Sequence, residues 1–247
     1  MAATSQALDR IRIVLCQTSH PGNIGASARA MKTMGIHTLY LVNPKKFPHP
    51  EATAMSSGAD DILKNAIVVN DLGSALKGVK LAIGLSARRR ELTQAYLEVG
   101  EVSHDMMRIA ENSEVAFVFG TEMSGLSNQE THQCQVLSFI DANPDYSSLN
   151  LAQAVQLVCH ELRQASLATN PPKLYTKDLN LLADHDSLMG FLTHLKETLE
   201  LIEFLDKVQG ERLMQRLHIL FARSQLEMDE VNILRGILTQ VQKKLRA

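Results

Sequence analysis

Short apolar runs recur along the first two thirds of the chain, separated by longer stretches of mixed polarity. Each run has four to six residues and is rich in Val, Ile, Leu and Phe, without strict alternation of polar and apolar positions. Such runs are typical of strands that are covered on both faces of a parallel sheet. The expected strands are Ile11–Cys16, Thr38–Val42, Ala66–Val69, Lys80–Leu85, Val115–Phe119 and Val136–Ile140.

Helical patterns lie between these strands, and the alternation of the two predicts an α/β domain with a mostly parallel sheet. After Ser147 the apolar period becomes helical, which predicts a long helix over about 148–166 with Ser147 or Ser148 as its N-cap. The other helices are expected around residues 23–34, 71–77, 103–112 and 127–133.

The C-terminal part of the chain has a different pattern, with apolar residues at helical spacing and no strand signal. Before it lies a stretch with Asn170-Pro171-Pro172 and mixed charges, which is typical of a linker. We therefore expect a core domain over 1–168, a linker over 169–186 and a small all-helical extension over 187–247.

The composition narrows the class of protein. With 45% hydrophobic residues and 21% charged residues, the chain is globular rather than disordered. The formal net charge is −2, so any contact with nucleic acid must come from a local basic patch. No apolar run approaches the ~18 residues of a membrane span, and the N-terminus lacks a signal-peptide pattern, so we expect a cytoplasmic protein with no membrane partner.

Three cysteines, Cys16, Cys134 and Cys159, lack the spacing of a disulfide framework or a zinc site. We expect them to be small buried residues, and we expect no metal. The motifs of P-loop, dinucleotide-binding, zinc-protease and nucleophile-elbow enzymes are also missing from the sequence. An enzyme of this class must therefore hold its ligand in another way, at the C-terminal ends of its strands.

The first loop at a strand end spans residues 21–31 and combines small residues with Asn23 and Arg29. Gly22 and Gly25 allow close backbone approach, and a helix that begins near Asn23 directs its N-terminal amides at an anion. Arg29 could add a bidentate contact to a phosphate. The alternative is a tight strand-to-helix turn with a solvated arginine.

Three further loops follow strands. Residues 120–128 carry Glu122 between two glycines, an arrangement that suits a small polar ligand, although an exposed loop carboxylate is the alternative. Residues 140–150 lead from a strand into the long helix. Arg88, Arg89 and Arg90 follow the strand that ends at Leu85 and form either a phosphate-binding patch or solvated surface.

Three motifs occur in order over about 150 residues: Asn23, Gly25 and Arg29; then Phe-Gly-Thr-Glu-Met-Ser-Gly-Leu at 119–126; then Ser-Ser-Leu-Asn at 147–150. Together they resemble the SPOUT superfamily of RNA ribose methyltransferases. Longer phrases at 18–35, 143–156 and 230–236 resemble the TrmJ-type tRNA (cytidine/uridine-2'-O-)-methyltransferases and extend the resemblance into the helical tail.

The resemblance implies a trefoil knot in the C-terminal part of the core and binding of S-adenosyl-L-methionine within it. It also implies a homodimer, in which Asn23 and Arg29 of one subunit complete the pocket of the other. The implied active-site polar set is Asn23, Arg29, Glu122, Ser148 and Asn150. The implied cofactor contacts are Leu85, Ser86, Ala87, Gly120, Ile140, Ser147, Ser148 and Leu149.

The implied substrate is tRNA, methylated on the ribose of C or U at nucleotide 32 of the anticodon loop. The expected RNA contacts are Arg29, Lys45, Lys46, Arg88, Arg89 and Arg90, together with the helical tail. Two alternatives stay open at the level of sequence. One is a ribosomal RNA ribose methyltransferase with the same catalytic residues, and the other is a non-catalytic RNA-binding protein of the same fold.

Overall fold

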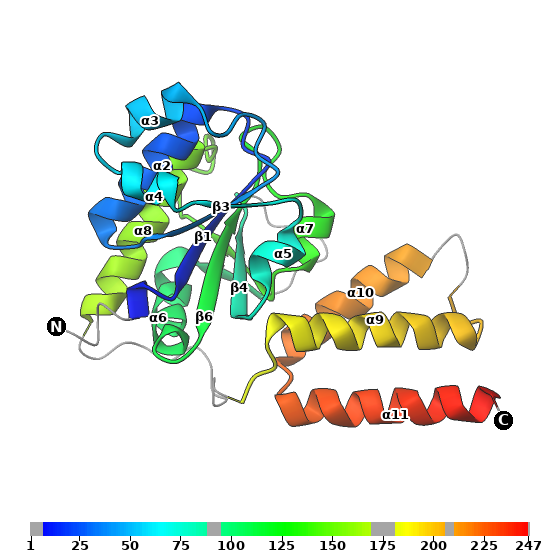
Figure 1. Ribbon diagram of the computed structural model, residues 1–247. Coiled ribbons are helices and arrows are strands. Elements are labelled where there is room, and N and C mark those ends of the chain that lie inside the picture. Colours follow the sequence, from blue (N-terminus) through cyan, green and yellow to red (C-terminus); the bar gives the residue numbers. More distant parts are fainter. Residues whose placement is uncertain (1–6, 88–94, 169–180, 206–209, 247) are drawn as a thin grey trace.

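The computed structural model describes residues 7–87, 95–168, 181–205 and 210–246 (Figure 1). Its described strands form one seven-stranded sheet in the order β3-β2-β1-β6-β4-β7-β5, and every neighbouring pair is parallel. The strands are β1 (Ile11–Cys16), β2 (Thr38–Val42), β3 (Ile67–Val69), β4 (Val79–Leu85), β5 (Ala95–Glu98), β6 (Glu114–Phe119) and β7 (Val136–Phe139).

Both faces of the sheet are buried, as the continuous apolar runs predict. In β1, Ile13 and Leu15 point into one hydrophobic cluster, and Val14 and Cys16 point into the other. The first cluster lies under the helices α2 (Pro21–Met34), α6 (Val99–Ala110) and α8 (Leu151–Leu167). The second lies under α5 (Leu72–Leu76) and the segment around α7 (Asn128–His132), on the other side of the sheet in Figure 1. The predicted α/β class is confirmed.

Six of the strands agree with the sequence prediction to within a residue or two, but three elements were missed. Strand β5 is short and pairs only with β7 at the sheet edge, so it carries little of the apolar signal that marks the central strands. Helices α3 (Pro50–Ser56) and α4 (Asp60–Lys64) are too short to show a helical period. They lie beside α2 on the outside of the core.

Three helix starts differ from the prediction. Helix α6 begins at Val99 and not at 103. Helix α2 begins at Pro21, because proline suits the first turn of a helix, and not near Asn23. Helix α8 begins at Leu151, and its N-cap is Asn150, whose side-chain oxygen accepts a hydrogen bond from the Ala152 amide at 2.9 Å. The prediction that Ser147 or Ser148 caps this helix was wrong. Both serines instead lie in the loop before it.

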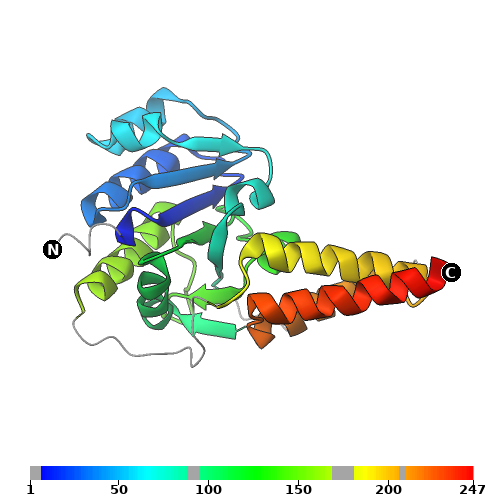
Figure 2. The ribbon, with the colours of Figure 1, turned by 60° about the horizontal axis from the view of Figure 1, so that its bottom comes forward.

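The C-terminal extension contains three described helices, α9 (His185–Leu201), α10 (Gly210–Ser224) and α11 (Met228–Arg246). Helices α9 and α11 run side by side and project from the core (Figure 2). Phe191 and Phe221 meet edge to face at 4.8 Å inside the small cluster that holds these helices together. Helix α9 begins within the segment expected as a linker, and residues 169–180 of that segment lie outside the described residues.

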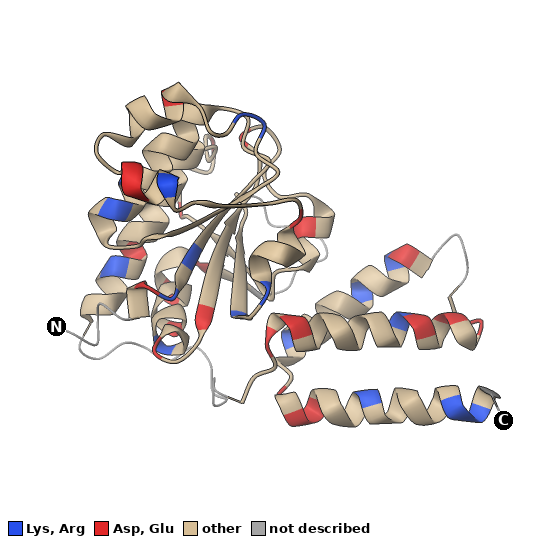
Figure 3. Ribbon diagram, viewed as in Figure 1, with Lys and Arg blue, Asp and Glu red and all other residues tan. Residues whose placement is uncertain are grey.

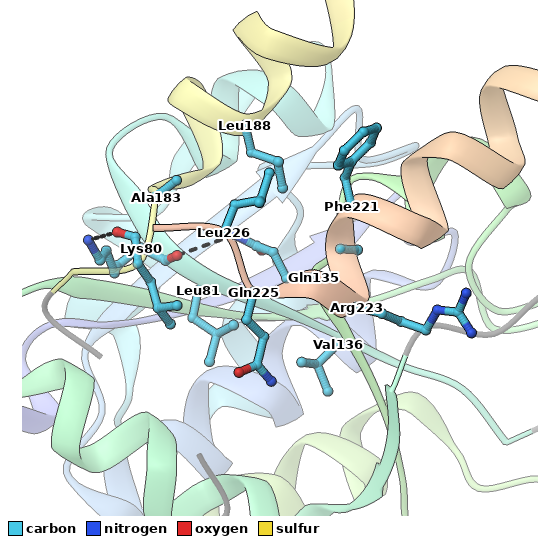
Figure 4. A pocket seen from close by; sticks show the side chains of 12 residues that line it. Lys80, Leu81, Gln135, Val136, Ala183, Leu188, Phe221, Arg223, Gln225 and Leu226 are labelled. Carbon is cyan, nitrogen blue, oxygen red and sulfur yellow. Dashed lines mark hydrogen bonds between the residues drawn. The ribbon is translucent and has the colours of Figure 1, made fainter. Parts of the chain in front are cut away.

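The extension touches the core at a few points. The Gly78 amide donates to Oδ2 of Asp186 at 3.0 Å, and the Lys80 ammonium donates to the Leu182 carbonyl. Between these contacts and α10 lies a cavity of about 330 Å³, lined on the core side by Leu81 and Val136 (Figure 4). A pocket that is partly open to solvent therefore occupies one part of the junction between the two units.

Other predictions concern single features of the chain. All three cysteines are buried and free, as predicted, and burial raises the pKa of each thiol. Among the described helices, none has the length and apolar character to cross a membrane. The trefoil knot stays a prediction.

Candidate active site

A pocket of about 830 Å³ opens at the C-terminal ends of the central strands β4, β6 and β7. Three loops and the start of α8 form most of its wall, because parallel strands all end at the same edge of the sheet. All eight residues expected to contact a cofactor lie on this wall: Leu85, Ser86, Ala87, Gly120, Ile140, Ser147, Ser148 and Leu149.

Glu122 lies on the same wall and is held by hydrogen bonds from the start of α2. The backbone amides of Ser19 and His20 donate to its carboxylate at 3.1 to 3.2 Å. The Asn23 side-chain amide donates to Oε1 of Glu122 at 3.0 Å, and Asn23 Oδ1 accepts from Asn150 Nδ2 at 3.0 Å. Three residues of the predicted polar set thus form one network within a single chain.

This network controls the charge of Glu122. Partial burial alone would raise the pKa of the carboxyl, but the hydrogen bonds from Asn23 and from the Ser19 and His20 amides favour the ionised form. They lower the pKa to about 2. A carboxylate of the chain itself thus accepts from the backbone amides that immediately precede α2.

The loop that carries Glu122 closes on itself. Thr121 and Gly125 exchange two backbone hydrogen bonds at 3.1 and 3.0 Å, and Gly125 has a φ of +68°, which favours glycine. A Cβ atom on Gly120 would lie 2.0 Å from the carbonyl carbon of Gly125, so a side chain cannot fit there. The two glycines allow the tight turn that presents Glu122 to α2.

Arg29 does not join this network in its own chain. It lies six residues after Asn23 on α2, which turns its side chain to a different side of the helix. The side chain is exposed, and its Nη1 lies 3.4 Å from the Ser57 hydroxyl. Arg29 is also absent from the lining of the pocket as the described residues form it.

The structure describes only some of the residues expected to bind RNA. Lys45 and Lys46 are exposed on the loop after β2, and the Lys45 amide donates to the Thr18 carbonyl at 3.0 Å, next to the Ser19–His20 segment that holds Glu122. Arg88, Arg89 and Arg90 lie outside the described residues. Figure 3 shows acidic and basic residues interspersed over both the core and the extension.

Comparison with known proteins agrees with this arrangement. The SpoU rRNA Methylase family matches residues 10–160, and the family described as tRNA methyltransferase TrmJ, C-terminal domain, matches residues 186–247. The tRNA (cytidine/uridine/adenosine-2'-O-)-methyltransferase TrmJ of Pseudomonas aeruginosa is 47% identical over 97% of this chain and 96% of its own length. The chain belongs to the TrmJ family. The predicted resemblance and the methyltransferase class are thereby confirmed.

Two solved structures resemble this TrmJ-family chain over nearly its full length. The crystal structure of TrmJ from Zymomonas mobilis ZM4 has a TM-score of 0.82 and 26% identity, and covers 94% of this chain and 98% of its own. A probable methylase family protein from Haemophilus influenzae Rd KW20 has a TM-score of 0.62 and 43% identity, and covers 97% of this chain and 98% of its own.

Gln215 lines the pocket without any signal in the sequence that points to this position. Gln215 of α10 belongs to the C-terminal extension, yet it lines the pocket of this TrmJ-family protein together with the core loops. It lies more than sixty residues after the last sequence motif of the site, at Asn150, within an ordinary amphipathic helix. Only the docking of the extension brings it to the pocket.

Proposed function

We propose that this TrmJ-family chain transfers a methyl group from S-adenosyl-L-methionine to a ribose 2'-hydroxyl of tRNA, at nucleotide 32 of the anticodon loop. The observation that carries the proposal is the pocket at the ends of β4, β6 and β7, which adjoins the network of Glu122, Asn23 and Asn150. The match to the TrmJ C-terminal domain favours tRNA over ribosomal RNA as the substrate. A cytoplasmic location agrees with such a substrate.

The pocket fits the proposed cofactor. Its volume of about 830 Å³ is in the range of sites for small molecules and cofactors. Leu85, Ile140 and Leu149 provide apolar surface for an adenine ring, and the loop backbones offer hydrogen-bonding groups for its polar atoms. The SpoU methyltransferase AviRb of Streptomyces viridochromogenes, which has this fold, was solved in complex with AdoMet. When bound, S-adenosyl-L-methionine supplies a methyl group on a sulfonium centre.

The protein must make the ribose 2'-hydroxyl reactive, because this group is a poor nucleophile that loses its proton as it attacks. Rigid positioning and positive charge near the developing alkoxide lower that barrier. Arg29 can supply both by binding the phosphate next to the target ribose. Glu122 is a poor candidate for the proton acceptor, since its pKa is about 2 and its oxygens already accept hydrogen bonds. We assign Glu122 to positioning.

Arg29 acts across a homodimer in this proposal. Its side chain points away from the pocket of its own chain, so a second subunit is the means of bringing it to a cofactor. Helix α8 packs against α2 and leaves Leu157 and Leu167 exposed at 40% and 58%. These apolar side chains are available for an interface beside α2. Asn23 is already engaged by Glu122 and Asn150 of its own chain, so the contribution to the partner falls to Arg29.

The role of Arg29 is tested by Arg29→Ala, with methyl transfer from labelled S-adenosyl-L-methionine to tRNA as the readout. We expect a loss of about 100-fold in turnover, the scale of removing one donor to a developing oxyanion. Lys32→Ala is the matched control, because Lys32 is a basic residue one turn further along α2 whose ammonium is already paired with Asp61 at 2.8 Å. Near-normal turnover of Arg29→Ala would remove Arg29 from the mechanism.

The substrate is tested by mapping ribose methylation by mass spectrometry in a strain that lacks this protein and in the same strain complemented with it. We expect a 2'-O-methyl group at nucleotide 32 of tRNA that disappears and returns with the gene. A methyl group lost from ribosomal RNA instead would favour the ribosomal alternative. Cofactor and RNA binding without any methylated product would favour the non-catalytic alternative.

A further inference from the structure

We infer that helix α10 of the extension completes the cofactor pocket through Gln215, so that docking of the extension and occupancy of the pocket strengthen each other. This inference rests on the proposed function, because it takes the pocket at the ends of β4, β6 and β7 as the cofactor site. It gives the extension a part in the methyl-donor site in addition to any contact with RNA.

The first observation is the position of Gln215. It is half-buried and lines the pocket beside Asn128, Thr131 and His132, which belong to the short helix α7 of the core. A side-chain amide offers two donors and one acceptor, which suits the polar groups of a nucleoside or an amino acid. Gln215 is thus a polar group of the extension placed where the cofactor is expected.

The second observation is the contact that holds α10 in this position. The rings of His218 and His132 lie 6.2 Å apart, and Nδ1 of His218 is 3.5 Å from the His132 carbonyl oxygen. Gln215 and His218 are three residues apart and therefore share one face of α10. One face of the helix thus rests on α7 and also reaches the pocket.

The third observation is a pocket between the core and the extension. This pocket of about 330 Å³ is partly open to solvent and lies between Leu81 and Val136 of the sheet and Leu188, Phe221 and Leu226 of the extension (Figure 4). Close packing is the rule inside protein units, and this part of the junction lacks it. A junction of this kind can be shifted by the modest free energy of a ligand contact.

If docking and binding are coupled, each must favour the other by the same factor. The cofactor then binds more tightly to the docked form, and the bound cofactor makes α10 harder to detach. A residue of the extension that contacts only solvent has neither effect. Both directions of the coupling can be measured in the full-length protein.

The first experiment measures the affinity of the full-length protein for S-adenosyl-L-homocysteine, the unreactive product form of the cofactor, by calorimetry. We expect Gln215→Ala to bind three- to ten-fold more weakly, the effect of losing one hydrogen bond. Gln240→Ala is the matched control, since Gln240 is an exposed glutamine on α11 of the same extension. We expect its affinity to equal that of the wild type.

A second variant separates docking from direct contact. Asp186→Ala removes the acceptor of the Gly78 amide at the junction and leaves the pocket lining intact. We expect it to weaken cofactor binding two- to three-fold while Gln215 is still present. Circular dichroism of each variant establishes that the helices are retained.

Hydrogen exchange measures the reverse effect, that of the bound ligand on the docking of α10. Saturating S-adenosyl-L-homocysteine should slow exchange over residues 210–224 in the wild type and in Gln240→Ala, but much less in Gln215→Ala. Unchanged affinity of Gln215→Ala together with ligand-independent exchange of α10 would overturn the inference. A wild-type protein that binds no cofactor at all would instead overturn the proposed function on which the inference rests.

Discussion

The core and the helical extension are stabilised to different degrees. Core strands contribute side chains with no exposed surface, such as Phe117 and Val118, on both faces of the sheet. In the extension a small cluster around Phe191 holds three helices together, and Ile233 and Ile237 of α11 remain 64% and 56% exposed. The core can therefore fix the geometry of a site by itself, whereas the position of the extension depends on what it docks against.

The same contrast is present within the pocket. Glu122 is fixed by several donors that all come from the core, and its carboxylate is ionised as a result. Gln215 reaches the pocket only through the docking of α10 on α7. One wall of the site is thus built from the core, and the extension adds Gln215 to the other.

The largest effect is expected from one type of substitution, Phe to Ala, made once in the core and once in the extension. Phe117→Ala should lower the free energy of unfolding of the core by about 3–5 kcal/mol, because it opens a cavity under the sheet. Phe191→Ala should unfold the extension and leave the thermal unfolding transition of the core unchanged. The affinity of this variant for the cofactor should stay within ten-fold of that of the wild type. Calorimetry with S-adenosyl-L-homocysteine present and absent measures both.

Phe204→Ala is the control for these two variants, since Phe204 is 62% exposed and its removal should change stability by no more than about 0.5 kcal/mol. If Phe191→Ala lowers the core transition as much as Phe117→Ala does, the two units unfold as one. The comparison would then be wrong.

The second test removes the charge that organises the core wall. Glu122→Gln should reduce kcat/KM by about 10- to 100-fold, since hydrogen bonds to a charged group contribute about 1.5–3 kcal/mol. Glu111→Gln, at an exposed glutamate of the core, is the matched control. Equal activity of both variants would show that the network around Glu122 is not needed for positioning.

The third test uses pH. The pKa of Glu122 is lowered to about 2 in the folded protein, whereas glutamate in an unfolded chain titrates at about 4.3. Because the folded-state pKa is the lower one, the stabilisation is complete above the unfolded value and is lost as the pH falls toward 2.

We expect the stability difference between the wild type and Glu122→Gln to shrink by about 1 kcal/mol between pH 5 and pH 2, a value reduced for solvent screening of a partly exposed group. Denaturant titrations of both proteins at several pH values give this difference. A difference that stays constant over the range would contradict the low pKa.

The smallest expected effect concerns RNA. The double variant Lys45→Ala and Lys46→Ala should weaken tRNA binding and reduce the slope of log Kd against log salt by about 2, one for each lost phosphate contact. The control is Lys64→Ala with Lys77→Ala, because these exposed lysines precede β3 and β4 and so lie toward the opposite edge of the sheet. Equal slopes for the two variants would remove Lys45 and Lys46 from the RNA contacts.

The sequence predicted the features that depend on local pattern. The central strands are apolar on both faces, and the polar motifs follow them directly, so strand ends that share one sheet edge had to bring Glu122 near Asn23 and Asn150. The edge strand β5 and the short helices α3 and α4 lack a full period and were missed. The N-cap of α8 was misplaced because several adjacent residues, Ser147, Ser148 and Asn150, are all good caps.

Features that depend on contacts between distant segments could not be predicted in this way. The six-residue spacing from Asn23 shows that Arg29 leaves a different side of α2, but whether that side faces the pocket depends on how the helix packs on the core. The place of Gln215 follows from the docking of α10 on α7, eighty residues away in sequence. Neither residue differs in type or neighbourhood from ordinary surface residues of a helix.

The hydrogen bonds from Ser19 and His20 to Glu122 determine which anions can use this strand end. The start of a helix, with its unpaired backbone amides, is a place where proteins commonly bind phosphate or sulfate. Here the amides just before α2 already donate to a carboxylate of the chain itself. A phosphate that approaches this strand end therefore meets a negative charge and has to be bound by other groups of the protein.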